Sequence, residues 1–201
     1  MKMYHKGKVV RRRGPESGRA PTDFFGHGEE IRATLAKHLP RRQVRALDVG
    51  SGFGRNAVFL AQHLSRRSHV FSLDPSQESL KRSADALAEA DLSSRASLVG
   101  GWAERLPFGP EVFKLTTAVM LFHHLVAVPP VLRELARVMT PDGSFLAVDW
   151  APTAHLLPFA VEHRAEDFLT PHAVERMLLE AGFLPSVEHH PLWYVIEAQK
   201  A

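Results

Sequence analysis

The chain has no cysteine among its 201 residues, and no run of 18 apolar residues occurs in it. Without a thiol it forms no disulfide, builds no thiolate zinc site and carries no cysteine nucleophile. The second absence predicts that no helix spans a membrane. The basic N-terminus is not followed by the apolar segment that a secretory signal requires. We therefore expect a cytoplasmic protein.

Acidic residues are scarce at the start of the chain, where residues 1–20 hold seven lysines or arginines against Glu16. The remaining residues carry 18 basic and 21 acidic side chains, so the net charge of +3 comes from this first segment. We predict that residues 1–20 form a basic, irregular and flexible tail and that residues 21–201 form a single domain. A basic tail can bind nucleic acid, but a solvated terminus is the favoured interpretation.

A glycine-rich stretch follows an apolar segment (44–49) and precedes a helix-compatible one (57–61). Strand, glycine turn and helix in that order are typical of a nucleotide-type ligand site at the carboxyl end of a sheet strand. The spacing G-x-G-x-G differs from the dinucleotide fingerprint, and Asp48 precedes it. An acid repels a pyrophosphate but attracts an ammonium group, which favours S-adenosylmethionine as the ligand. The glycines of the predicted site are Gly50, Gly52 and Gly54.

Apolar segments of strand length alternate with segments whose apolar residues recur at helical spacing. This order predicts an α/β protein with a doubly wound, mostly parallel seven-stranded sheet and an antiparallel C-terminal strand. We expect a turn at 141–143 and an irregular stretch at 150–167. The expected strands cover 44–49, 69–73, 96–100, 112–120, 144–149, 187–190 and 193–198, and the expected helices cover 29–39, 55–64, 77–90, 131–139 and 170–182.

Asp74 ends the second expected strand, where an acid is placed to bind both ribose hydroxyls. After the third strand, Trp102 is expected to flank an adenine ring, and the main-chain amide of Ala103 to bond the edge of that ring. Pro75, next to Asp74, and Met120, at the end of the fourth strand, complete the predicted cofactor site.

Several motifs resemble the class I S-adenosylmethionine-dependent methyltransferases, in particular the small-molecule group that includes the ubiquinone and menaquinone biosynthesis methyltransferases. The resemblance covers about residues 44–183 and implies a Rossmann-like fold, with S-adenosylhomocysteine as the product. Asp74 looks like the ribose acid of the family. The other motifs are residues 47–54, which look like the first cofactor motif, 101–108, similar to G-D-A-E-x-L-P-F, 113–125, similar to F-D-L-V…L-H-H-L, and 132–143, similar to L-x-E-x-x-R-V-L-K-P-G-G.

Two residues depart from the family pattern. Trp102 replaces the acid that usually contacts the adenine amino group, so we expect adenine binding to rest on stacking and main-chain amides. Lys114 replaces an aspartate at the start of the fourth strand. That position is usually at the far end of the sheet, so we expect little effect on chemistry.

Methyl transfer, as the resemblance implies it, is an in-line displacement at a sulfonium that depends largely on positioning and on the exclusion of water. A base is needed only where the nucleophile must lose a proton. His123 and His124 are candidates, because histidine transfers protons near neutral pH. Adjacent residues cannot point the same way in a regular element, so one of them is expected to face the site. A structural role for both is the alternative, and Asp149 is a further candidate.

The methyl acceptor is expected over the carboxyl ends of the fourth and fifth strands, where ligands of doubly wound sheets bind. Residues 150–167, which are apolar with a few polar groups, are expected to cover it together with two adjacent aromatic residues. Such a cover suits a small, largely apolar or aromatic acceptor. No metal is expected. The predicted acceptor contacts are Phe24, Phe25, Trp150, His163 and Arg164.

Two other functions stay open. An RNA methyltransferase would use the basic tail as an electrostatic handle, but the body is acidic and no appended RNA-binding module is visible in the sequence. A non-catalytic S-adenosylmethionine-binding or partner protein is the other alternative. The presence of Asp48, the three glycines and Asp74 argues against it.

Overall fold

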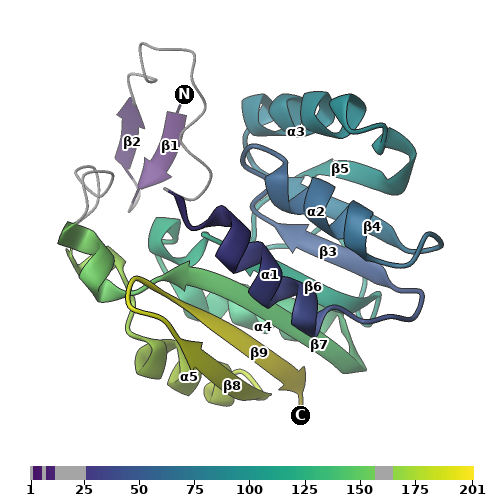
Figure 1. Ribbon diagram of the computed structural model, residues 1–201. Helices are drawn as coiled ribbons and strands as arrows, with labels where there is room; N and C mark the ends of the chain where they lie inside the picture. The colour runs from purple at the N-terminus through teal and green to yellow at the C-terminus, as the bar shows by residue number, and fades with distance from the viewer. Residues whose placement is uncertain (1, 6–7, 12–25, 157–164) are drawn as a thin grey trace.

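The computed structural model describes residues 2–5, 8–11, 26–156 and 165–201, and a seven-stranded sheet forms its centre (Figure 1). The strands lie in the order β5-β4-β3-β6-β7-β9-β8. Their sequences are rich in β-branched and apolar residues, which pack well on a pleated sheet. The strands are β3 (Arg45–Val49), β4 (His69–Asp74), β5 (Ala96–Gly100), β6 (Phe113–Val119), β7 (Met139–Trp150), β8 (Phe183–His189) and β9 (Trp193–Lys200).

Neighbouring strands from β5 to β7 are parallel, whereas β9 is antiparallel to both β7 and β8. The chain moves outward from β3 to β5 and then returns to place β6 on the other side of β3. This reversal makes the β3/β6 junction the topological switch point, where doubly wound sheets bind ligands. The predicted fold class is therefore confirmed.

Helices cover both faces of the sheet, with α1, α2 and α3 on one face and α4 and α5 on the other (Figure 1). Each face has its own apolar core, centred on Leu60 and Val148 under α1 and α2 and on Leu135 and Phe145 under α4. None of the helices in the described ranges is long and apolar enough to cross a membrane. The helices are α1 (Gly28–His38), α2 (Arg55–His63), α3 (Gln77–Glu89), α4 (Val128–Val138) and α5 (Pro171–Glu180).

Gly54 lets α2 begin directly against α3. Its φ is +77°, and a Cβ built on it would lie 2.7 Å from the Cα of Ser83 in α3. Ser76 caps the start of α3 by accepting a hydrogen bond from the amide of Ser79 at 3.3 Å. The two helices that follow the first two parallel strands are thus held together next to the glycine turn.

The structure differs from the sequence-based expectations in the tail, at residues 141–143 and in β8, which begins at Phe183 rather than at residue 187. The tail was expected to be irregular, but β1 (Lys2–His5) and β2 (Lys8–Arg11) pair as an antiparallel hairpin. Each strand contains β-favouring residues, which explains the pairing. Residues 141–143, expected as a turn before a strand at 144–149, lie instead within β7, which begins at Met139, and a register shift against β6 accommodates them as a bulge.

Candidate active site

The parallel strands from β5 to β7 all end at the same edge of the sheet (Figure 1), and the predicted cofactor residues lie at or just after the ends of these strands. The glycine turn follows β3, Asp74 ends β4 and Trp102 follows β5. The histidine pair follows β6 in a short 3₁₀ turn, Phe122–His124. Residues far apart in sequence are brought together here because parallel strands share one carboxyl edge.

The glycine turn has a conformation that favours glycine at three positions. The φ angles of Gly50, Gly52 and Gly54 are +87°, +50° and +77°. The amides of Gly50 and Ser51 donate to the carbonyl of Leu73 at 2.8 and 3.0 Å, which fastens the turn to β4. A Cβ on Gly52 would meet nothing closer than the Gly50 carbonyl at 4.0 Å, so this backbone faces open space. A ligand can therefore approach the main chain closely at this position.

Asp48 lies inside the sheet rather than at the ligand face. Its carboxylate is fully buried and accepts hydrogen bonds from Asn56 Nδ2 at 2.5 Å, Ser72 Oγ at 2.8 Å and Thr117 Oγ1 at 3.1 Å. Burial raises the pKa of Asp48 to about 6, although these hydrogen bonds oppose the rise. The expectation that this acid is aimed at the ligand needs correction, because Asp48 links β3, β4, β6 and the start of α2. Its contact with a cofactor stays a prediction.

Asp74 occupies the position expected of a ribose-binding acid. Its Oδ2 accepts from the amide of Gly52 at 3.1 Å, and its Oδ1 accepts from the amide of Ser76 at 2.8 Å. A carboxylate has about four acceptor sites, so two remain for a pair of hydroxyl groups. The side chain thus ties the glycine turn to the β4 end while keeping acceptor capacity. Pro75 beside it is exposed.

The loop after β5 is fastened by an ion pair that our sequence analysis did not single out. Glu134 and Arg137 of α4 pair at 2.7 Å, Glu134 accepts from the amide of Leu106 at 2.7 Å, and Arg137 donates to the carbonyls of Leu106 and Phe108. The hydrogen bond from Arg137 holds the pKa of Glu134 below its usual value. These two residues belong to the L-x-E-x-x-R-V motif, whose spacing could have been used to identify them.

This anchored loop presents Trp102 and Ala103 differently. The Trp102 side chain is 49% exposed, whereas Ala103 is buried. An exposed indole beside the carboxyl end of β5 is of the kind that stacks on a planar ring. Stacking of adenine on Trp102 stays a prediction. Lys114 lies at the opposite end of the sheet, as expected. There it pairs with Asp142.

The two adjacent histidines lie in different environments. His123 is 6% exposed, and its Nδ1 donates to Asp149 Oδ1 at 2.6 Å. Asp149 also accepts from the amides of Phe122 at 2.6 Å and Trp150 at 2.7 Å, so the carboxylate is rigidly held. The ring of Phe168 lies parallel to His123 with centroids 5.8 Å apart. A buried Asp–His dyad therefore lies at the carboxyl ends of β6 and β7.

The other predicted residues near the ends of β6 and β7 lie in different environments. His124 is partly exposed, and its ring lies 4.0 Å from that of His123, so the two rings are in contact rather than pointing apart. Trp150 is 2% exposed and packs in the core under α1, on the sheet face opposite Asp149. Met120 has a positive φ of +55°, an uncommon backbone conformation that often marks functional sites.

Four predicted acceptor contacts, Phe24, Phe25, His163 and Arg164, lie outside the described residues. Their roles stay predictions. Within the described ranges, no group of three or more histidine or acidic residues is arranged to hold a metal ion.

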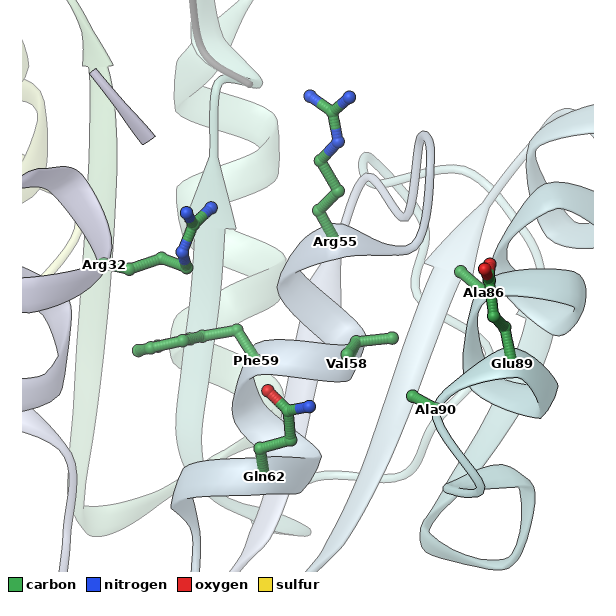
Figure 2. Close-up of a pocket in the computed structure, with 8 residues that line it drawn as sticks. All are labelled: Arg32, Arg55, Val58, Phe59, Gln62, Ala86, Glu89 and Ala90. Atoms are coloured by element: carbon green, nitrogen blue, oxygen red, sulfur yellow. The ribbon is translucent and has the colours of Figure 1, made fainter. Parts of the chain in front are cut away.

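A separate groove of about 420 Å³ lies between α1, α2 and α3 (Figure 2). None of the site residues predicted from the sequence lines this groove. It lies on the helical face rather than over the carboxyl ends of β6 and β7. We therefore do not assign the methyl acceptor to it. Its lining consists of Arg32, Arg55, Val58, Phe59, Gln62, Ala86, Glu89 and Ala90.

The doubly wound sheet with one antiparallel strand, and the glycine turn facing an acid at the end of the next strand, define a Rossmann-like nucleotide-binding class. Residues 47–147 match the family model of the methyltransferase domain, which is half of the chain. The chain belongs to this family, the class I S-adenosylmethionine-dependent methyltransferases. The open glycine turn and the remaining acceptor capacity of Asp74 fit S-adenosylmethionine.

Similar proteins support this membership. The chain is 30% identical over 140 residues to the uncharacterized methyltransferase YcgJ of Bacillus subtilis, covering 69% of this chain and 54% of the relative. It is 30% identical over 126 residues to a demethylmenaquinone methyltransferase of Listeria monocytogenes, covering 63% and 53%. The chain thus spans about half the length of these curated relatives. The fold is similar to that of a methyltransferase from Aquifex aeolicus, with a TM-score of 0.72, 19% identity and coverage of 85% and 89%.

Proposed function

We propose that this protein transfers the methyl group of S-adenosylmethionine to a hydroxyl-bearing aromatic molecule, and that the His123–Asp149 dyad removes the hydroxyl proton. The observation that carries the proposal is the 2.6 Å hydrogen bond between these side chains at the predicted acceptor position. The relative named demethylmenaquinone methyltransferase supports a quinol-like acceptor. An aromatic ring would also suit a site that contains Phe168.

The dyad has the arrangement that a histidine base needs. A carboxylate can only accept a hydrogen bond, so the Nδ1 of His123 carries a proton and Nε2 carries the basic lone pair. Asp149 holds the ring in this tautomer and stabilises the imidazolium that forms when Nε2 takes a proton. Two backbone amides fix Asp149 in turn. His123 is therefore positioned as a base, and burial keeps water from competing with the acceptor.

The remaining residues would hold the donor. S-adenosylmethionine, when bound, supplies an electrophilic methyl group and leaves as S-adenosylhomocysteine. Asp74 would bind the ribose hydroxyls, the glycine turn would receive the amino-acid moiety, and Trp102 and Ala103 would flank the adenine.

The proposal is tested by methyl transfer from radiolabelled S-adenosylmethionine to catechol and to 1,4-naphthohydroquinone. We expect Asp149→Asn and His123→Ala to lower kcat about 10²–10⁴-fold while leaving S-adenosylhomocysteine affinity unchanged by calorimetry. His124→Ala is the matched control and should lower kcat much less. Full activity in the His123 and His124 single and double variants would show that positioning alone suffices. Unchanged activity combined with a lower Tm would instead assign His123 a structural role.

A further inference from the structure

Tyr194 carries a buried hydroxyl that has no hydrogen-bond partner in the described part of the chain. The residue is 1% exposed and is the second residue of β9. A buried polar group without a partner lowers stability, and phenylalanine would fill the same space without that penalty. The buried hydroxyls of Ser51 and Ser83 likewise have no partner among the described residues, whereas Thr116 contacts Met139 Sδ at 3.0 Å and Thr117 donates to Asp48. The unpaired phenol therefore calls for an explanation.

The position of Tyr194 connects it to the dyad. It pairs directly with Asp149 in the antiparallel register of β7 and β9. Directly opposed residues in such a pair place their side chains on the same face of the sheet. Tyr194 accordingly packs in the core on the α4 and α5 face, in the same cluster as Phe122 and Ala151. Asp149 and Tyr194 both lie near the carboxyl ends of the parallel strands, where the acceptor is proposed to bind.

Asp149 does not need Tyr194 as a partner. Its Oδ2 accepts from the amide of Phe122, and its Oδ1 accepts from His123 and from the amide of Trp150. Burial, together with the charge of Asp149, raises the pKa of Tyr194 well above its ordinary value. The phenol therefore stays neutral near neutral pH, and it keeps a proton to donate.

We propose that Tyr194 is the hydrogen-bond donor that positions the methyl acceptor, by binding an oxygen next to the hydroxyl that His123 deprotonates. The inference rests on the proposed function of the dyad. It narrows the acceptor to aromatic compounds with two neighbouring oxygens, of which catechol is the simplest. The proton of one hydroxyl passes to His123 and that oxygen gains the methyl group, while the second oxygen accepts from Tyr194. A compound with one hydroxyl leaves the phenol unpaired, and sites of this kind discriminate strongly against such analogues.

Fluorine NMR tests the contact without requiring turnover. The chain has two tyrosines, Tyr4 and Tyr194, so 3-fluorotyrosine labelling of the full chain gives two resonances. Tyr194→Phe assigns them. With S-adenosylhomocysteine present, saturating catechol should shift the Tyr194 resonance, whereas phenol should leave that resonance unchanged. A Tyr194 resonance that does not move with catechol overturns the proposal.

Kinetic measurements test whether Tyr194 sets the preference for an acceptor with two neighbouring oxygens. We expect Tyr194→Phe to lower the ratio of kcat/KM for catechol over phenol at least tenfold, with Tm unchanged or raised. Thr116→Val, which removes a buried hydroxyl elsewhere in the core, should leave the ratio unchanged. A ratio retained in Tyr194→Phe refutes the positioning role. If the unmodified protein methylates neither compound but the Tyr194 resonance still shifts with catechol, the proposed catalysis fails while the binding role of Tyr194 stands.

Discussion

The buried Asp48 gives a prediction about stability against pH. Burial raises the pKa of this carboxyl from 3.8 to about 6 in the folded protein. Below pH 3.8 both the folded and the unfolded chain hold the proton, and Asp48 costs nothing. As the pH rises towards 6, the unfolded chain loses the proton while the folded chain keeps it, so Asp48 lowers the free energy of unfolding. Above pH 6 the cost is constant at roughly 3 kcal/mol, at about 1.4 kcal/mol per pKa unit.

The variant Asp48→Asn isolates this effect, because the amide has nearly the same shape and does not titrate. We expect the free energy of unfolding of the variant, relative to the unmodified protein, to rise by roughly 2 kcal/mol between pH 4.5 and 7.5. Urea unfolding followed by tryptophan fluorescence at several pH values measures it. Only the change with pH of this difference in the free energy of unfolding is interpreted, because the variant also changes the hydrogen bonds to Asn56, Ser72 and Thr117.

Asp85→Asn, at an exposed acid of α3, is the matched control and should give a change within about 0.5 kcal/mol. A flat difference for Asp48→Asn, or one that falls as the pH rises, would refute the reasoning. It would mean that the three hydrogen bonds to Asp48 outweigh the effect of burial.

Three further predictions concern the glycine turn, the ribose acid and the N-terminus. Gly54→Ala should lower the free energy of unfolding by about 1–3 kcal/mol, because the Cβ would meet the backbone of Ser83, whereas Gly109→Ala has open space and should have little effect in the same urea assay. Asp74→Ala should weaken S-adenosylhomocysteine binding by roughly 1.5–3 kcal/mol in calorimetry, and unchanged affinity would remove this acid from the site. Deletion of residues 1–20 should leave cofactor affinity and Tm nearly intact. If the segment serves RNA, the full chain should bind tRNA with a steep salt dependence that the deletion abolishes.

Most helices and strands were predictable because their signals are local. Periodicity, capping residues and glycine positions placed β3, β4, β5 and β6 within a residue of their observed bounds. β7 is the exception, because it begins at Met139 rather than at residue 144. Residues 141–143 have the composition of a turn, but the strand pairs on either side of them, Phe113 with Met139 and Leu115 with Ser144, include them in β7 as a bulge.

The candidate site was predictable only in part. The adjacency of His123 and His124 identified a pair but could not distinguish its members. The distinction depends on Asp149, 26 residues away, whose side chain faces His123 through the parallel pairing of β6 and β7. The surroundings of the Asp48 side chain were not predictable for the same reason, since its three partners lie on other elements.

The order of the elements, the glycine turn and the cofactor class could be predicted from the chain alone, because these depend on residues close together along it. Which polar side chains share a site depends on how the elements pack. The tertiary structure buried Asp48 among Asn56, Ser72 and Thr117, paired His123 with Asp149, and enclosed the Tyr194 hydroxyl. Those contacts depend on strand register and on the face that each side chain occupies, and a shift of one residue in register would have separated them.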